Sequence, residues 1–166
     1  VERDYLIRRW DLKTLVTGAI KANARELIAA HVAPVCENLD FEVFTDEKWL
    51  EFILGQLIQN SIKYAREDGA KIVFSGALLD EGLASERIEL TVADNGCGVS
   101  AADLPRVFEK GYTGYNGRGG QKSTGLGLYL VHQTAEMLHC RVSLSSRIGE
   151  GTSVTIDLHQ EELGKE

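Results

Sequence analysis

The sequence predicts a two-layer α/β (α+β) sandwich, in which a mixed, mostly antiparallel sheet has helices packed on one face. Three stretches carry apolar residues at helical spacing, and runs in which apolar and polar residues alternate lie between them. Two pairs of these runs are joined by short, turn-rich connections, which favours antiparallel pairing. Helices with one apolar face must bury it on the sheet. The other face of the sheet is expected to be polar or to be covered by a partner.

The first half of the chain predicts two helices and a short strand. The first helix covers residues 12–31, and Pro34 is expected to help end it. Its apolar positions are Leu12, Leu15, Val16, Ala19, Ile20, Leu27 and Ile28. Phe41 and Val43 alternate with polar neighbours and predict a strand. Asp46 then has a favourable position to cap a helix that runs to Ala65.

The second half predicts two hairpins that flank an irregular segment. The first hairpin joins residues 72–74 and 88–92 through the loop DEGLASE, and the second joins 142–144 and 154–158. Residues 95–123 contain many glycines and little apolar periodicity. Such a long irregular stretch is usually either functional or disordered. A helix is predicted to begin at Thr124, and its apolar face contains Leu128, Val131, Ala135 and Leu138.

Bulk properties narrow the class of protein. A chain of 166 residues fits one domain, and a formal net charge of -7 argues against general nucleic-acid binding, which needs a basic face. Cys36, Cys97 and Cys140 are spaced too widely for a CxxC metal site, so reduced thiols are expected. We divide the chain into the end of a connecting helix or linker (1–10), one main domain (11–160) and a tail (161–166), and we interpret it as a fragment of a longer protein.

A polar stripe runs along the predicted helix that Asp46 begins. Gln56, Asn60 and either Lys63 or Tyr64 are three or four residues apart, so they share one edge of the helix. The amide oxygen of Asn60 suits a hard cation such as Mg²⁺, and Lys63 offers a positive charge to a phosphate. A solvated helix edge remains an alternative interpretation.

Two glycine-containing turns could hold the two ends of a nucleotide. Asp94 ends a predicted strand and could accept a hydrogen bond from an exocyclic amine, while Gly96 and Gly98 would let the backbone approach a flat ring. The segment 123–127 opens a helix, whose free N–H groups favour anions, and Arg118 and Lys122 could add charge. The spacing fits neither GxxxxGK[ST] nor GxGxxG. A plain turn and ordinary helix capping are the alternatives.

Four segments in a fixed order resemble the N, G1, F and G2 boxes of the catalytic ATP-binding domain of bacterial sensor histidine kinases. They are QLIQNSIKYA (56–65), DNGCGVS (94–100), VFEKGYTGYNGR (107–118) and KSTGLGLYL (122–130). The resemblance implies a Bergerat-type ATP-binding fold of the GHKL superfamily. More narrowly, DEKWLEFILGQLIQNSIKYA resembles the intramembrane-sensing kinases of Gram-positive bacteria, which work with peptide-antibiotic export pumps, as in bacitracin resistance.

The resemblance also implies roles for individual residues. Asn60 would bind Mg²⁺, Lys63 would contact a phosphate, Tyr64 would cover the nucleotide, and Asp94 would bind the adenine amine. Gly96 and Gly98 would shape the adenine pocket, and Phe108 would anchor a lid. The remaining expected nucleotide contacts are Tyr112, Arg118, Lys122, Ser123, Thr124, Gly125, Leu126 and Gly127.

Two positions depart from the patterns of the superfamily. Its hydrolases carry a Glu that activates water four residues before the Mg²⁺-binding Asn, whereas this chain has Gln56, whose amide is not an effective base. Many histidine kinases carry an Arg shortly after the F-box aromatic residue, and the matching position here is Thr113. Arg118 or Lys110 could supply the missing charge.

The sequence therefore predicts a kinase domain that transfers the γ-phosphoryl group of MgATP to a His on a separate dimerisation domain, for relay to a response regulator. His31, His132, His139 and His159 all lack the context of a phosphoacceptor, so each is interpreted as structural or on the surface. The parent protein is expected to be a homodimer in a bacterial cell membrane with this domain in the cytoplasm. The alternatives are a nucleotide-binding module without kinase activity and an ATP hydrolase.

Overall fold

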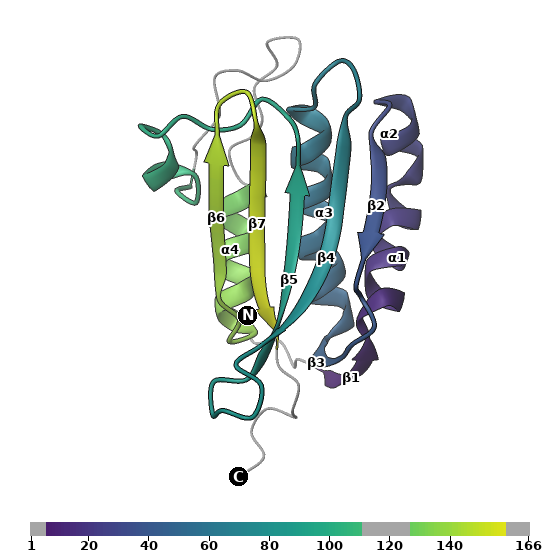
Figure 1. The fold of residues 1–166 in the computed structure, drawn as a ribbon, viewed down its shortest axis with the longest axis vertical. Coiled ribbons are helices and arrows are strands. Elements are labelled where there is room, and N and C mark those ends of the chain that lie inside the picture. Colours follow the sequence, from purple (N-terminus) through teal and green to yellow (C-terminus); the bar gives the residue numbers. More distant parts are fainter. Residues whose placement is uncertain (1–5, 111–126, 159–166) are drawn as a thin grey trace.

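The computed structural model describes residues 6–110 and 127–158. Within them, one sheet has five strands in the order β2-β4-β5-β7-β6, and a separate ribbon pairs β1 with β3 (Figure 1). The strands of the sheet are β2 (Ala33–Glu37), β4 (Lys71–Leu79), β5 (Arg87–Asp94), β6 (Val142–Arg147) and β7 (Gly151–Leu158). Strand β2 runs parallel to β4, and every other pair in this sheet is antiparallel. The predicted mixed, mostly antiparallel sheet is confirmed.

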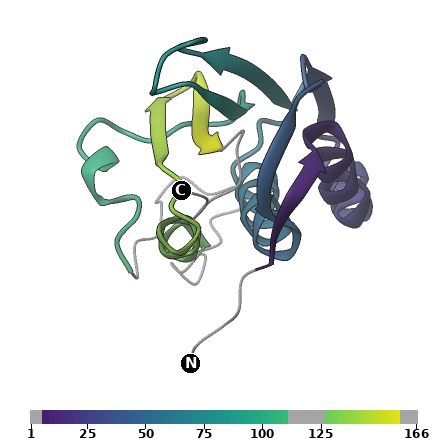
Figure 2. The same ribbon diagram turned by 90° about the horizontal axis from the view of Figure 1, so that it is seen from below.

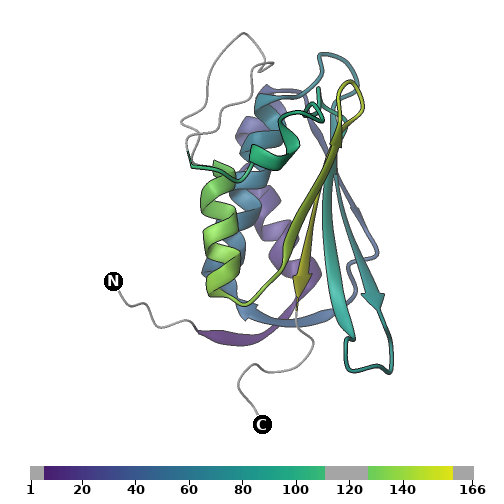
Figure 3. The same cartoon turned by 90° about the vertical axis from the view of Figure 1, so that its left-hand side faces the viewer.

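The helices cover one face of the sheet (Figure 3). They are α1 (Leu12–Ala22), α2 (Ala24–Ala29), α3 (Glu47–Lys63) and α4 (Gly127–Met137), and a 3₁₀ turn, η1, covers Leu104–Arg106. The core lies between the two layers, where Leu54 and Ile58 of α3 and Phe74 and Leu90 of the sheet are fully buried. Seen along the helices, α4 and α3 lie side by side beneath the sheet (Figure 2), in agreement with their many mutual contacts. The two predicted layers are confirmed.

The face of the sheet away from the helices is mainly polar along β5, β6 and β7. Residues on this face pair across the strands, as in Thr91 with Thr155 and Ser145 with Ser153. The hydroxyl oxygens of Thr91 and Thr155 are 3.4 Å apart. Of the two expectations for this face, the polar surface is therefore the one that the described strands show.

The predicted helix over residues 12–31 is wrong as a single element, because it divides at Asn23 into α1 and α2. The Asn23 Nδ2 donates to the carbonyl of Ala19 (2.9 Å), and its Oδ1 accepts from Gln59 Nε2 on α3 (2.9 Å). An Asn side chain that bonds nearby backbone competes with the helical ladder, which ends α1 at this point.

Two strands in the first part of the chain, β1 and β2, were not predicted. The expected end of a connecting helix or linker over residues 1–10 is not helical in its described part, since β1 (Ile7–Asp11) pairs antiparallel with β3 (Glu42–Asp46), and the linker interpretation stays a prediction. The predicted strand around Val43 therefore exists, but it lies outside the main sheet. Pro34 lies inside β2, at the edge of the sheet, where a residue without an N–H is tolerated.

Candidate functional site

Helix α3 carries the predicted polar stripe. It begins at Glu47 because Asp46 Oδ1 accepts hydrogen bonds from the N–H groups of Lys48 (3.0 Å) and Trp49 (3.2 Å). The helix buries an apolar face that consists of Leu50, Ile53, Leu54, Leu57 and Ile58. Its predicted functional residues Gln56, Asn60 and Lys63 are half-buried, and Tyr64 is the C-cap. The stripe therefore lies at the margin of the core and not on a fully solvated edge.

Asp94 is at the end of β5, and three hydrogen bonds fix its carboxylate. Oδ1 accepts from the N–H groups of Gly96 (2.9 Å) and Thr152 (3.3 Å), and Oδ2 accepts from the hydroxyl of Ser61 (2.8 Å). Burial raises the pKa of Asp94, although all three hydrogen bonds act to lower it. The carboxylate is thus desolvated and attached to α3, to its own turn and to β7.

The two glycines that follow Asp94 are required by close contacts with neighbouring backbone. A Cβ on Gly96 would overlap the carbonyl oxygen of Tyr64, and that oxygen accepts the N–H of Cys97 (3.0 Å). Gly98 has φ +75°, and a Cβ on it would overlap the carbonyl of Arg147. These glycines therefore let the turn pack between the end of α3 and the β6–β7 hairpin, in addition to the predicted role beside a flat ring, which stays a prediction.

Three residues at this site were missed by the sequence reasoning. Ser61 lies inside the first of the four segments, one residue after Asn60, but nothing in the sequence pairs it with Asp94. Thr152 faces Asp94 because the two residues are partners in the register of β5 and β7. Ser146 bonds the N–H of Val99 through its Oγ (2.7 Å). The run SRIGEGT was interpreted only as a hairpin turn, since strand register cannot be read from a single sequence.

The third segment (107–118) contacts α4, the helix that begins within the fourth segment (122–130). The ring of Phe108 lies 5.3 Å from the ring of His132, tilted by 34°, so Phe108 packs against α4. The neighbouring Val107 is buried. Gly127, the first residue of α4, faces α3, since a Cβ on it would stand 3.3 Å from Gln56 Oε1. The described parts of the four segments therefore come together around α3 and α4. The other predicted nucleotide contacts, Tyr112, Arg118, Lys122, Ser123, Thr124, Gly125 and Leu126, lie outside the described residues.

Burial shifts the pKa of two side chains at the site, those of Lys63 and Cys97. Lys63 Nζ is 5.7 Å from the centre of the Tyr64 ring, and partial burial lowers the pKa of its ammonium group. Burial raises the pKa of the Cys97 thiol, and the nearby charge of Asp94 raises it further. Cys97 therefore stays protonated at neutral pH and acts as a small apolar residue.

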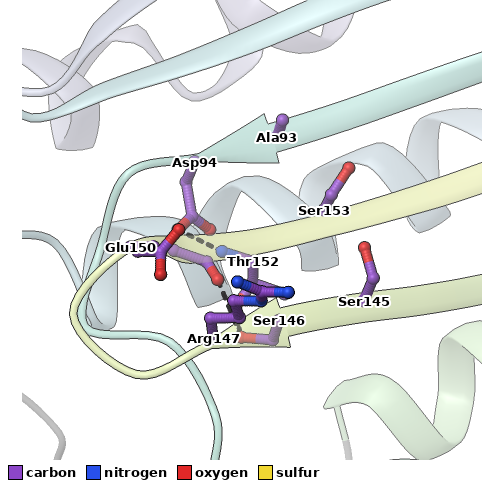
Figure 4. A pocket seen from close by; sticks show the side chains of 9 residues that line it. Ala93, Asp94, Ser145, Ser146, Arg147, Glu150, Thr152 and Ser153 are labelled. Carbon is purple, nitrogen blue, oxygen red and sulfur yellow. Dashed lines mark hydrogen bonds between the residues drawn. The ribbon is translucent and has the colours of Figure 1, made fainter.

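A shallow hollow of about 320 Å³ lies beside Asp94 (Figure 4). Ser145, Ser153 and Arg147 point into it from the front of the strands, and the helices lie behind the sheet in this view. The hollow is thus on the face of the sheet away from α3, whereas Asp94 Oδ2 turns toward Ser61 on α3. Its lining includes Asp94 but neither Asn60 nor Lys63.

Comparison with known proteins supports the assignment of these segments. Residues 45–162 match the family described as "Histidine kinase-, DNA gyrase B-, and HSP90-like ATPase". The chain is 39% identical over 156 residues to the sensor histidine kinase YxdK of Bacillus subtilis, covering 92% of this chain and 46% of the relative. It is 32% identical over 161 residues to the sensor protein BceS of Halalkalibacterium halodurans, covering 97% of this chain and 46% of the relative.

A solved structure shows the same fold. The Acinetobacter baumannii histidine kinase AdeS superposes with a TM-score of 0.73 at 24% identity, covering 96% of this chain and 70% of that one. The chain spans about half the length of the curated relatives it matches. Within residues 6–110 and 127–158, no helix has the length and apolar character needed to cross a membrane. The chain belongs to the family of histidine kinase-, DNA gyrase B- and HSP90-like ATPases, and within it to the ATP-binding domains of sensor histidine kinases.

Proposed function

We propose that this domain binds MgATP between α3, α4 and the Asp94 turn, and transfers the γ-phosphoryl group to a His on a separate dimerisation domain. Asp94 supports the adenine end of this assignment. A carboxylate offers about four lone-pair positions, and Gly96, Thr152 and Ser61 occupy three of them. Oδ2 keeps one position for a donor such as the amine of adenine, and an ionised acceptor strengthens such a bond.

The metal would be held jointly by the chain and the phosphates of the nucleotide. In the described part of the chain, no three His, Cys, Asp or Glu side chains come together in a way that could hold a metal ion. Asn60 offers one neutral oxygen, and Mg²⁺ commonly binds one or two protein oxygens together with substrate phosphates. The donor set therefore fits Mg²⁺ that arrives with ATP. Lys63, on the same edge of α3, would add positive charge beside the phosphates.

Gln56 is the observation that favours transfer to a protein over hydrolysis. The α3 side chain that faces the start of α4 is an amide, with Oε1 turned toward Gly127. An amide can orient a phosphate or a water molecule, but it cannot accept a proton as a carboxylate does. An acceptor imidazole brings its own nucleophilic nitrogen, so transfer to His needs no base at this position. Catalysis then depends on positioning and on neutralisation of charge.

Phosphotransfer from this domain to an acceptor supplied separately would test the proposal. The dimerisation domain of the same protein is prepared alone and mixed with this domain and ATP labelled on the γ-phosphate. We expect acid-labile label on the acceptor and almost no phosphate release without it. Nucleotide binding without transfer would support a nucleotide-binding module instead, and steady phosphate release from this domain alone would support a hydrolase.

The place of the domain in a longer protein follows from the same proposal. The relatives are sensor kinases about twice as long as this chain. We propose that the domain lies on the cytoplasmic side of a membrane-bound, homodimeric sensor, and that the phosphoryl group passes on to a response regulator. A peptide-antibiotic transporter is the proposed partner of the parent protein.

A further inference from the structure

Asn95 is followed by Gly96, and an asparagine before a glycine can react with its own main chain. Glycine has no Cβ to shield its nitrogen, so the nitrogen of Gly96 can attack Cγ of the Asn95 side chain. The new N–Cγ bond closes a five-membered imide, the Cγ–Nδ2 bond breaks, and ammonia leaves with the proton of the attacking N–H. One water molecule then opens the ring and leaves aspartate or isoaspartate at position 95.

The side-chain amide of Asn95 is held at both ends by the main chain at the start of β4. Its Oδ1 accepts the N–H of Lys71 (2.9 Å), and its Nδ2 donates to the carbonyl of Gly69 (2.9 Å). The end of β5 lies beside this segment (Figure 1), because β4 and β5 pair antiparallel. The amide has to turn the face of Cγ toward the nitrogen of Gly96 before the two can react. Both hydrogen bonds therefore have to break first.

The attacking nitrogen is held as well. The N–H of Gly96 donates to Asp94 Oδ1 (2.9 Å), and Gly96 is buried against the carbonyl of Tyr64. The nitrogen becomes nucleophilic only when it loses its proton, and the neighbouring carboxylate disfavours the negative charge that forms. The attack therefore also requires that Gly96 leave Asp94.

We propose that Asn95 is a site of spontaneous deamidation, whose rate is set by the opening of the turn formed by Asp94, Asn95 and Gly96. The closed turn keeps the two reacting groups apart, and local opening releases both. Asn95 is only half-buried, so water reaches it once the turn opens. The reaction needs no nucleotide, metal ion or partner, so it is independent of the proposed phosphotransfer.

Both products prevent the turn from closing again in its original form. Aspartate at position 95 lacks the N–H group that Asn95 donates to Gly69, and it places a second carboxylate next to Asp94. Isoaspartate adds one atom to the main chain directly before Gly96, where even a Cβ would overlap the carbonyl of Tyr64. Deamidation is therefore expected to make a transient opening of the turn permanent.

The test follows the conversion of Asn95 by peptide mass spectrometry at mildly alkaline pH, with the full chain in buffer and in guanidinium chloride. Asn116 and Gly117 form a second Asn-Gly pair, which gives a reference rate in the unfolded chain. In guanidinium chloride, Asn95 and Asn116 should convert at similar rates. In buffer, Asn95 should convert on the order of 10²-fold more slowly than in guanidinium chloride, since three hydrogen bonds have to break. A difference of less than about threefold, the effect of one hydrogen bond or less, would overturn the inference.

A matched pair of variants tests the hold on the side chain. Lys71→Pro removes the N–H that bonds Asn95 Oδ1, and proline is tolerated at the first residue of a strand. Lys71→Ala keeps this N–H and is the control. We expect Asn95 to convert about three- to tenfold faster in folded Lys71→Pro than in Lys71→Ala. Denaturation curves give the unfolded fraction of each variant, and a rise that this fraction explains by itself would refute the local hold.

A second pair tests the hold on the nitrogen and serves if Lys71→Pro does not fold. Asp94→Ala removes the acceptor of the Gly96 N–H, whereas Ser61→Ala removes only the contact of the other carboxylate oxygen. Conversion of Asn95 should again be about three- to tenfold faster in Asp94→Ala than in Ser61→Ala. Equal rates in this pair would show that Asp94 does not restrain the reaction.

Discussion

Ser61 and Asp94 are joined by a hydrogen bond of 2.8 Å between Ser61 Oγ and Asp94 Oδ2. Ser61 lies one residue after Asn60 on α3, and Asp94 is the last residue of β5. This bond therefore connects the helix that carries Asn60 and Lys63 directly to the residue proposed to bind adenine. A shift of either element would change the distance between the two ends of the nucleotide site.

Replacing Asp94 by Asn should weaken ATP binding about 10- to 100-fold, since hydrogen bonds to a charged acceptor contribute about 1.5–3 kcal/mol. The amide can still accept from Gly96 and Thr152, so the fold should persist. Calorimetry measures the affinity, and circular dichroism checks the fold. Asp157→Asn is the control with the same charge change, because Asp157 is near the other end of β7 and pairs with Arg87 (3.5 Å). An unchanged affinity of Asp94→Asn would refute the adenine assignment.

The same variant should alter how stability depends on pH. Burial raises the pKa of Asp94 above its value in the unfolded chain, which is about 3.9. Between these two pKa values the folded state binds more protons, so this carboxyl group makes the fold less stable as pH rises through that window. An amide does not titrate, so Asp94→Asn does not lose stability in this pH window. The free energy of unfolding of the variant, relative to the unmodified chain, should therefore increase from pH 3.5 to pH 7, as measured by urea denaturation. A pH-independent difference would contradict the raised pKa.

Gly151→Ala should destabilise the fold far more than Gly149→Ala, although both glycines lie in the same hairpin. Gly151 has φ +124°, and a Cβ there would overlap the carbonyl of Asp94, whereas Gly149 has φ +81° and open space around it. Backbone strain alone should lower the free energy of unfolding of Gly149→Ala by about 1–2 kcal/mol. The overlap of the new Cβ with the carbonyl of Asp94 should raise this loss for Gly151→Ala to about 3 kcal/mol or more. Thermal melts should separate the two variants by at least about 3 °C. Equal melting temperatures would argue against this close approach.

Replacing Gln56 by Glu should create hydrolase activity. The two side chains have nearly the same shape, so a carboxylate would stand where Gln56 Oε1 now faces Gly127. General-base catalysis typically contributes 10²-fold or more, so steady phosphate release from MgATP should rise on the order of 10²-fold. Gln56→Ala controls for loss of the amide and should show no such rise. Release that stays at the background level in Gln56→Glu would mean that Gln56 does not face the γ-phosphate.

Asp46→Ala should cost more stability than Asp11→Ala, although both remove a helix N-cap. Asp46 is 6% exposed; its Oδ1 caps α3, and its Oδ2 accepts the N–H of Leu6 (2.7 Å). Asp11 caps α1 at an exposed position. We expect about 1 kcal/mol for Asp11→Ala and about 2–3 kcal/mol for Asp46→Ala, because the Asp46 carboxylate is buried and three N–H groups lose it as their partner. Urea denaturation measures both losses, and similar values would indicate that Asp46 acts only as a cap.

Much of the fold could be predicted from local pattern. Helix α3 is marked by Asp46 and by apolar residues at helical spacing, and the hairpin of β4 and β5 is marked by strict alternation. The pattern failed where tertiary contacts override it. Asn23 divides a helix whose apolar spacing continues, because its side chain bonds both the carbonyl of Ala19 and Gln59 on α3. Strand β2 is short and contains Pro34, so only its pairing with β4 reveals it.

The candidate site was likewise predictable only in part from the sequence. The sequence alone determined its chemical groups: an amide-bearing helix edge with Gln56 and Asn60, a carboxylate in a glycine turn at Asp94, and glycines at the start of a helix. These depend on residue type and on spacing within one element, which a sequence contains. Only the tertiary structure decided that Ser61 and Thr152 contact Asp94 and that Ser146 contacts Thr152. Their approach depends on the register of β5, β6 and β7 and on the packing of α3, and these are set by contacts between residues as distant in the chain as Ile88 and Leu158.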